Sequence, residues 1–151
     1  MKKQLILFGL LLYSICSFGQ DIIELKEKSD YKKAEPMVIK ICSFLFNNPV
    51  THEKETRQAG ASYIVQWMSG TPDYTFTVTQ EGMQLIGSKQ EYMALYMAAQ
   101  TMVVLENKDK KLTPEQIEKG GIDLLINYCS NPANNIKLSK SMKKYKKKNG
   151  V

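Results

Sequence analysis

The sequence predicts a mainly α-helical protein, with four or five helices packed like a bundle in a single domain. Apolar residues recur at helical spacing through most of the chain. Each such stretch is bounded by Pro, Gly or Asn, or by a Ser or Thr that can cap a helix. Only in residues 74–86 does the period change to alternation, which predicts a short β-hairpin between helices.

The first nineteen residues have the features of a signal peptide. Two lysines precede an apolar run over residues 5–12, and Ser17 and Gly19 supply the small residues of a cleavage signal. The run is too short for a hydrocarbon core of about 30 Å, which needs about twenty apolar residues. We therefore expect a mature domain over residues 20–151, exported to the periplasm or the extracellular space, with no transmembrane anchor after cleavage.

Export determines how the cysteines are interpreted. Cys16 falls within the predicted signal peptide, and the bulky Ile15 before it disfavours lipid anchoring. Cys42 and Cys129 would remain in a compartment where thiols are usually oxidised, which favours a disulfide between them. Such a bridge would close a loop of about ninety residues and contribute about 4 to 5 kcal/mol. The alternative is a pair of buried free thiols.

Two helices are expected in the first half of the mature chain. Pro36 suits the first position of a helix that ends at Asn47, while residues 20–30 before it form a loose arm or a short helix. Thr51 is expected to cap a second helix, which stops at Gly70. The first of these helices is apolar on most sides, as expected for a helix inside a bundle.

The predicted hairpin follows. Residues 74–79 alternate between apolar side chains and threonine, and Glu81 and Gly82 can turn the chain back into a second strand over residues 83–86. A two-stranded hairpin is marginal in water by itself. Its apolar side is therefore expected to rest on the helices.

The third long helix is expected to be the centre of the domain. Ser88 and Glu91 have the spacing of a capping box, in which each side chain accepts a bond from the other residue's backbone. From there to Leu105 the sequence is apolar on nearly every side.

The fourth long helix has the clearest start in the chain. Thr113 and Gln116 form a second capping box around Pro114. Gly120 and Gly121 inside this helix each cost about 1 kcal/mol against alanine. We expect close approach of a neighbouring helix as the reason for them.

Positive charge is concentrated at the end of the chain. The protein has 21 Lys and Arg against 15 Asp and Glu, a formal net charge of +6 at pH 7. Seven lysines follow the last acid, Asp123, and without them the mature chain is mildly acidic. A last, lysine-rich helix is expected over residues 136–148, with Leu138, Met142 and Tyr145 on one face and the lysines on the other.

These lysines form the strongest surface signal. Five of them fall within six positions, which raises the local positive potential enough to hold an anion. We expect an anionic envelope component or another protein as the partner, and no nucleic acid. The alternative is that the cations only stabilise the helix end and keep the protein soluble. The candidate binding residues are Lys143, Lys144, Lys146, Lys147 and Lys148.

A second candidate binding surface is a groove formed by Trp67, Asp73 and Tyr74 near the predicted hairpin. The same corner supports an alternative function, that of a small envelope-associated hydrolase using two carboxylates, because Glu53 and Glu81 are near it in sequence. Capping and turn roles explain these acids equally well. Core packing explains the aromatic residues.

Other chemistries are disfavoured. His52 begins a zinc-protease pattern, but Thr56 stands where the second histidine is required, and the chain has no other histidine. Methionines at 93, 97 and 102 do not share one helix face, which argues against a copper site. There is no nucleophile-elbow serine and no glycine-rich phosphate loop. We predict no catalytic residue, no metal and no cofactor.

In size, class and cysteine count the chain is similar to small exported helical proteins such as periplasmic acid chaperones and the immunity proteins that neutralise secreted toxins. This resemblance covers architecture only and assigns no residue a role. The sequence as a whole predicts an exported, non-catalytic binding protein.

Overall fold

The computed structural model describes residues 22–151, so the predicted signal peptide, residues 1–19, lies outside the described residues. The described chain is helical, which confirms the predicted class, and contains no β-strand in residues 22–151. Its elements are α1 (Lys28–Asn47), α2 (Lys54–Gly70), α3 (Gln80–Ile86), α4 (Gln90–Glu106), α5 (Pro114–Ser130), a short 3₁₀ turn η1 (Pro132–Asn134) and α6 (Lys140–Asn149).

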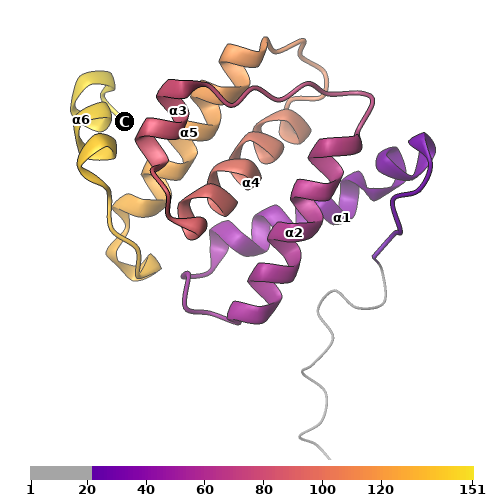
Figure 1. Cartoon of the computed structure of the whole chain (residues 1–151), viewed down its shortest axis with the longest axis horizontal. Coiled ribbons are helices and arrows are strands. Elements are labelled where there is room, and N and C mark those ends of the chain that lie inside the picture. The colour runs from indigo at the N-terminus through magenta and orange to yellow at the C-terminus, as the bar shows by residue number, and fades with distance from the viewer. Residues whose placement is uncertain (1–21) are drawn as a thin grey trace, which may run out of the picture.

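Helix α4 is the centre of the structure, as the sequence predicts. It contacts α1, α2, α3 and α5, and it lies between α5 and the α1–α2 pair in Figure 1. Nine of its residues are buried, among them Leu95, Tyr96 and Ala98. Two of the nine are polar. The side-chain amide of Gln100, fully buried, has no hydrogen-bond partner within residues 22–151, and Thr101 bonds the carbonyl of Met97.

The two glycines of α5 allow it to lie directly against α4. A Cβ atom at Gly121 would stand 2.8 Å from Cγ of Gln100 and 3.1 Å from its backbone nitrogen. A Cβ at Gly120 would stand 3.1 Å from Cγ2 of Val103. The predicted close approach is therefore confirmed, with α4 as the neighbour and Gly121 at its tightest point.

Helix α1 begins eight residues before the predicted start. Asp30 accepts a hydrogen bond from the backbone N–H of Glu27 at 2.9 Å and so closes the first turn around Lys28. Pro36 lies inside the helix rather than at its first position. Its ring removes the N–H that would bond the carbonyl of Lys32. The helix continues because Ala34, Met37 and other residues on both sides of the proline are buried in the core.

Two predicted caps are also wrong. Helix α2 starts after Glu53, which has a left-handed backbone (φ 41°), and the hydroxyl of Thr51 instead accepts a bond from the amide of Asn135. Helix α4 starts after Lys89, and Ser88 lies in the turn before it. The capping box at the start of α5 is confirmed. Gln116 accepts from the backbone N–H of Thr113 at 2.8 Å, and Thr113 accepts from that of Gln116 at 3.3 Å.

The predicted hairpin is not formed. Residues 74–79 have no regular secondary structure and no strand partner among residues 22–151, and the predicted second strand is helix α3. The alternating pattern has another cause, because Tyr74 and Phe76 pack their rings against Trp67 on α2. Gly82, the expected turn residue, lies in the first turn of α3, whose N-cap is Thr79.

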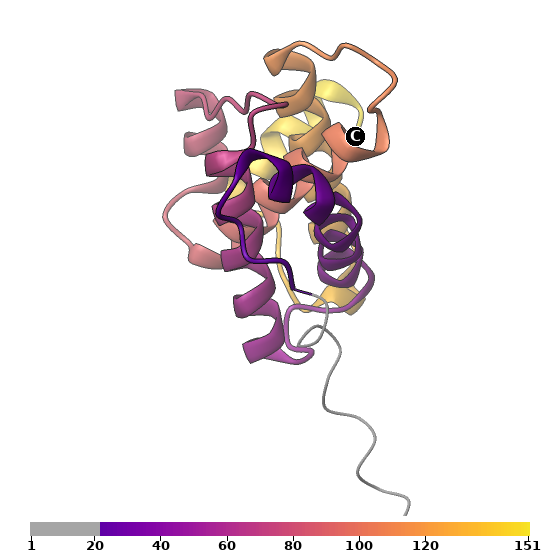
Figure 2. The same cartoon turned by 90° about the vertical axis from the view of Figure 1, so that its right-hand side faces the viewer.

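Helix α6 is shorter than predicted and packs as an amphipathic helix. It begins after Ser139, whose hydroxyl accepts the N–H of Met142 at 3.0 Å. Met142 is fully buried, and α6 contacts α3. Tyr145 and Lys146 tie it to α5 through bonds to Asp123 and Ser130. Figures 1 and 2 together place α6 at the opposite end of the molecule from the start of α1.

The predicted disulfide is not present. Cys42 on α1 and Cys129 on α5 are both buried as free thiols. Burial raises the pKa of both groups, that of Cys129 to about 12, so neither is a thiolate at neutral pH. Each acts as a small apolar side chain in the core. The free-thiol alternative is therefore the one that the structure supports.

Candidate functional site

The candidate binding residues separate into two surfaces. The lysines lie on α6, at the outer edge of the molecule in Figure 1. Asp73 and Tyr74 lie in the segment between α2 and α3, where they border one cavity. Trp67, on α2, belongs to neither surface because it is fully buried.

The exposed face of α6 carries unpaired positive charge. Lys143, Lys144, Lys147 and Lys148 are exposed, and none of them forms an ion pair within residues 22–151. Lys146 is different because it is half-buried and donates to the hydroxyl of Ser130 at 2.8 Å. Helix α6 contains no acidic residue. Four of the five candidate lysines are therefore free to meet a partner, and the fifth attaches the helix to α5.

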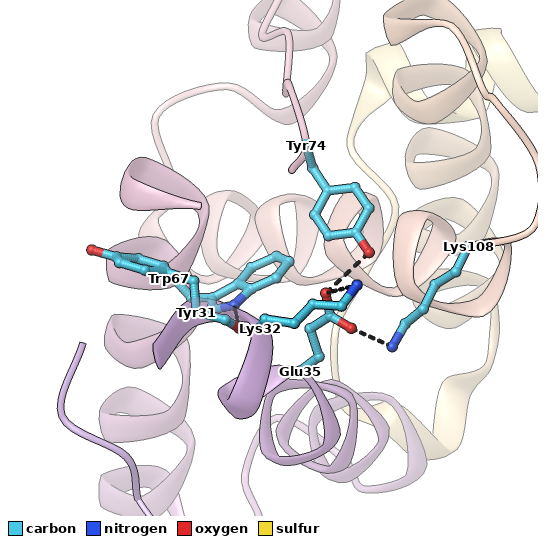
Figure 3. A network of polar contacts seen from close by, with 6 residues as sticks. All are labelled: Tyr31, Lys32, Glu35, Trp67, Tyr74 and Lys108. Carbon is cyan, nitrogen blue, oxygen red and sulfur yellow. Dashed lines mark hydrogen bonds and ion pairs between the residues drawn. The ribbon is translucent and has the colours of Figure 1, made fainter. Parts of the chain in front are cut away.

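Trp67 has a structural role. Its indole nitrogen donates to the backbone carbonyl of Tyr31 at 2.8 Å, which joins α2 to the first turns of α1 (Figure 3). The ring centroids of Tyr74 and Phe76 lie 5.7 and 6.2 Å from that of Trp67. The aromatic residues that suggested a groove are thus packed on one another.

A buried carboxylate organises the same corner. Glu35 on α1 is only 3% exposed, and its oxygens accept from Lys108 at 2.5 Å and from the hydroxyl of Tyr74 at 3.1 Å. The Nζ atom of Lys32 lies 3.3 Å from Oε1 of Glu35, so a second cation faces the carboxylate. Figure 3 shows the two lysines and Tyr74 converging on this carboxylate. Burial alone would raise the pKa of Glu35, but the bonds from Lys108 and Tyr74 outweigh it, and the pKa lies below its ordinary value of 4.5.

A cavity of about 430 Å³ opens next to this network. Asp73 and Tyr74 border it on one side, and the loop between α4 and α5 borders it on the other. That loop contributes Lys108, Lys110 and Lys111, so the rim is basic. Lys108 is engaged by Glu35 and Lys110 donates to Asn107 at 2.7 Å, which leaves Lys111 without a polar partner within residues 22–151.

The carboxylates considered for hydrolysis do not converge. Glu53, Asp73 and Glu81 are all exposed and lie before α2, after α2 and in α3 respectively. Glu35, the buried carboxylate bonded to the cavity residues Tyr74 and Lys108, has a lowered pKa, whereas a general acid requires a raised one. No cluster of potential metal ligands occurs in residues 22–151. The arrangement offers charge and surface for binding.

Besides Glu35 and Lys108, two buried polar residues with long-range partners are absent from the sequence predictions. Glu118 on α5 is buried and accepts three hydrogen bonds on one oxygen, two from Thr79 and one from Tyr96. Arg57 on α2 is buried and donates to backbone carbonyls at the end of α1. One sequence signal points to the burial of Glu118, because it directly follows Ile117, which belongs to the apolar stripe of α5. Arg57 has no comparable signal.

Replacing Glu35 by Gln is expected to make stability less dependent on pH. The lowered pKa of Glu35 means that its ionised form stabilises the folded state. This contribution is present above the ordinary value of 4.5 and is lost as the pH falls through the folded-state pKa. Urea unfolding at a series of pH values should show Glu35→Gln furthest below the wild type near pH 7, with the difference shrinking as the pH falls below 4.5. The control is Glu24→Gln, at an exposed ion pair with Lys26. An offset for Glu35→Gln that is constant across the series would contradict this account.

The fold and these surfaces define a small helical protein with a basic outer helix and a basic-rimmed cavity. No protein-family model matches the chain, and comparison with curated proteins and with solved structures gives no significant match either. None of the helices within residues 22–151 combines the length and apolar character needed to cross a membrane.

Proposed function

We propose that this chain is an exported, non-catalytic binding protein whose α6 helix engages an anionic surface of the cell envelope. The observation that carries the proposal is the exposed face of α6, where five lysines, Lys140 and the four exposed candidates, have no ion-pair partner in the described part of the chain. Export rests on the signal-peptide features of residues 1–19.

The packing of α6 supports this use. Because Met142 is fully buried and Tyr145 and Lys146 bond to α5, the helix is held in place and its lysine face points outward as a fixed surface. A lysine near an anionic membrane contributes about 1 kcal/mol at physiological ionic strength. Four such residues on one rigid face act together, and their attraction weakens as salt rises.

The test is binding of the mature chain to vesicles. We expect cosedimentation with vesicles that contain phosphatidylglycerol and none with pure phosphatidylcholine, and a steep loss of binding between low and high salt. Replacing the four exposed candidate lysines of α6 by Gln, with Lys140 kept, should lower binding by more than about tenfold. The variant should fold normally, because the replaced side chains are exposed and form no ion pair within residues 22–151. The four substitutions are Lys143→Gln, Lys144→Gln, Lys147→Gln and Lys148→Gln.

A matched control removes the same charge elsewhere. Lys28, Lys33, Lys40 and Lys54 are exposed on α1 and α2, and replacing them by Gln changes the net charge equally. If only net charge matters, both variants lose binding to the same extent, and the assignment to α6 is wrong. Binding that does not depend on salt or lipid charge would contradict the proposal as a whole.

For export, mass spectrometry of protein recovered outside the cytosol should find an N-terminus close to Gln20, and an intact Met1 would contradict it.

A further inference from the structure

A second and larger cavity, of about 580 Å³, lies between the end of α1, the first half of α2 and the start of α4. It shares no lining residue with the cavity beside Tyr74, and no residue of α6 borders it. Its volume is in the range of small-molecule sites, which is about 300 to 1,000 Å³.

One wall of this cavity is apolar. Ala61 and Val65 line it from α2, and Met93 and Ala94 line it from α4. The two alanines leave room that larger side chains would fill. Val65 is 39% exposed, one of few large apolar side chains with such exposure in residues 22–151, and Met93 is half-buried. The wall therefore presents apolar surface that a ligand could cover.

The end of the cavity near α1 is positively charged. Arg57 lines it and is only 8% exposed. Its Nη1 atom donates to the carbonyls of Leu45 at 3.0 Å and Asn48 at 3.2 Å. These bonds satisfy the N–H groups of Nη1. They leave the positive charge of the guanidinium without a negative partner, because Arg57 forms no ion pair with any acid in residues 22–151. Buried charges are normally paired.

Two further charged residues border the cavity. Lys54 lies one turn before Arg57 on α2 and also lacks an ion pair in the described residues. Glu91, at the start of α4, is the acidic residue on the lining, and it is exposed. The lining therefore carries a net positive charge at neutral pH, with a buried guanidinium as its least hydrated member.

We propose that this cavity binds a small ligand that carries one carboxylate on an apolar chain or ring. The carboxylate faces Arg57 and Lys54, and the apolar part lies against Val65 and Met93. A guanidinium is suited to this role because its planar fork matches the two oxygens of a carboxylate. Bonding to the end of α1 explains the two contacts of Nη1, but it explains neither the missing acid nor the open apolar wall. This site goes beyond the proposed function of α6 and does not depend on it.

The test compares three ligands that share one apolar chain. Octanoate, octanol and octyltrimethylammonium are titrated into the mature chain by isothermal calorimetry. We expect octanoate to bind about 10- to 100-fold more tightly than octanol, the range for hydrogen bonds to a charged group. The ammonium compound should bind more weakly than octanol. Equal affinity for octanoate and octanol would overturn the proposal.

Two variants locate the site. Ala94→Phe fills the cavity and should abolish octanoate binding, whereas Ala59→Phe, at an exposed position of α2 outside the lining, should leave it unchanged. Lys54→Gln should weaken octanoate binding but not octanol binding. Thermal unfolding followed by circular dichroism checks that each variant is folded. A folded Ala94→Phe protein that binds octanoate like the wild type would refute the site.

The α6 variant separates the two proposals. The protein with Gln at the four exposed candidate lysines of α6 should bind octanoate normally, whatever its behaviour on vesicles. If it loses octanoate binding, the ligand is held by α6 and not by this cavity.

Discussion

Replacing Glu118 by Leu is expected to lower the free energy of unfolding by about 3 kcal/mol. Oε1 of Glu118 accepts from the backbone N–H of Thr79 at 3.0 Å, from its hydroxyl at 2.9 Å and from the hydroxyl of Tyr96 at 2.6 Å. Leucine has a similar size but no acceptor. It would therefore leave the fully buried hydroxyl of Tyr96 unpaired and release the N-cap of α3.

A double-mutant cycle with Tyr96→Phe is the sharpest measurement. Urea unfolding at pH 7 gives the stability of the wild type, both single variants and the double variant. Because Tyr96→Phe removes the donor that Glu118→Leu leaves unpaired, the double variant should be less destabilised than the sum of the two single ones. Additive effects would mean that Glu118 and Tyr96 do not stabilise the fold through their mutual bond.

Replacing Gly121 by Ala is expected to destabilise the protein by about 2 kcal/mol, although alanine is the better helix former by about 1 kcal/mol. The added Cβ would stand 2.8 Å from Cγ of Gln100, and 3.1 and 3.3 Å from the backbone N and Cα of that residue. A backbone atom cannot move without shifting α4. The two helices would have to separate along their contact.

Gly120→Ala is the matched control, one residue earlier in the same helix. Its Cβ would meet only the side chain of Val103, at 3.1 and 3.2 Å from the two methyl groups. A side chain can adjust, so the variant should be close to neutral. Thermal unfolding of both proteins decides between the two effects. If both variants are more stable than the wild type, helix propensity governs these positions and the close contact is unimportant.

The parts of the fold that depend on local signals were predictable. The start of α5 follows from Thr113, Pro114 and Gln116, because a capping box and a proline act within one turn. The central position of α4 follows from its apolar residues on nearly every side. Both features are decided by residues close in sequence.

The errors arise where distant contacts outweigh local pattern. Residues 74–79 alternate as a strand does, but a strand also needs a partner, and here Tyr74 and Phe76 pack on Trp67 instead, while Val78 is 42% exposed. Pro36 is a good first residue of a helix, yet burial on both sides of it carries α1 through the proline. The disulfide was inferred from the expected compartment, and that inference contains no information on where the two sulfurs lie.

The candidate sites were predictable only in part. The basic face of α6 follows from composition and helical spacing, and four of its five exposed lysines are among the candidate residues that the sequence predicts, Lys140 being the fifth. The pair of Glu35 and Lys108 joins residues 73 positions apart, and no local pattern announces it. The burial and the partners of Arg57 are likewise set by where α1 ends, because its guanidinium donates to the carbonyls of Leu45 and Asn48. Buried charges of this kind are set by tertiary packing.

Trp67 is the only tryptophan in the chain, and its indole N–H is bonded to the backbone of Tyr31. The tryptophan fluorescence of the protein therefore originates at the joint between the first turns of α1 and the end of α2. Detachment of those turns would expose the chromophore to water and shift its emission to longer wavelength, even while the rest of the core stayed intact. One optical signal thus follows the docking of the N-terminal segment as an event separate from global unfolding.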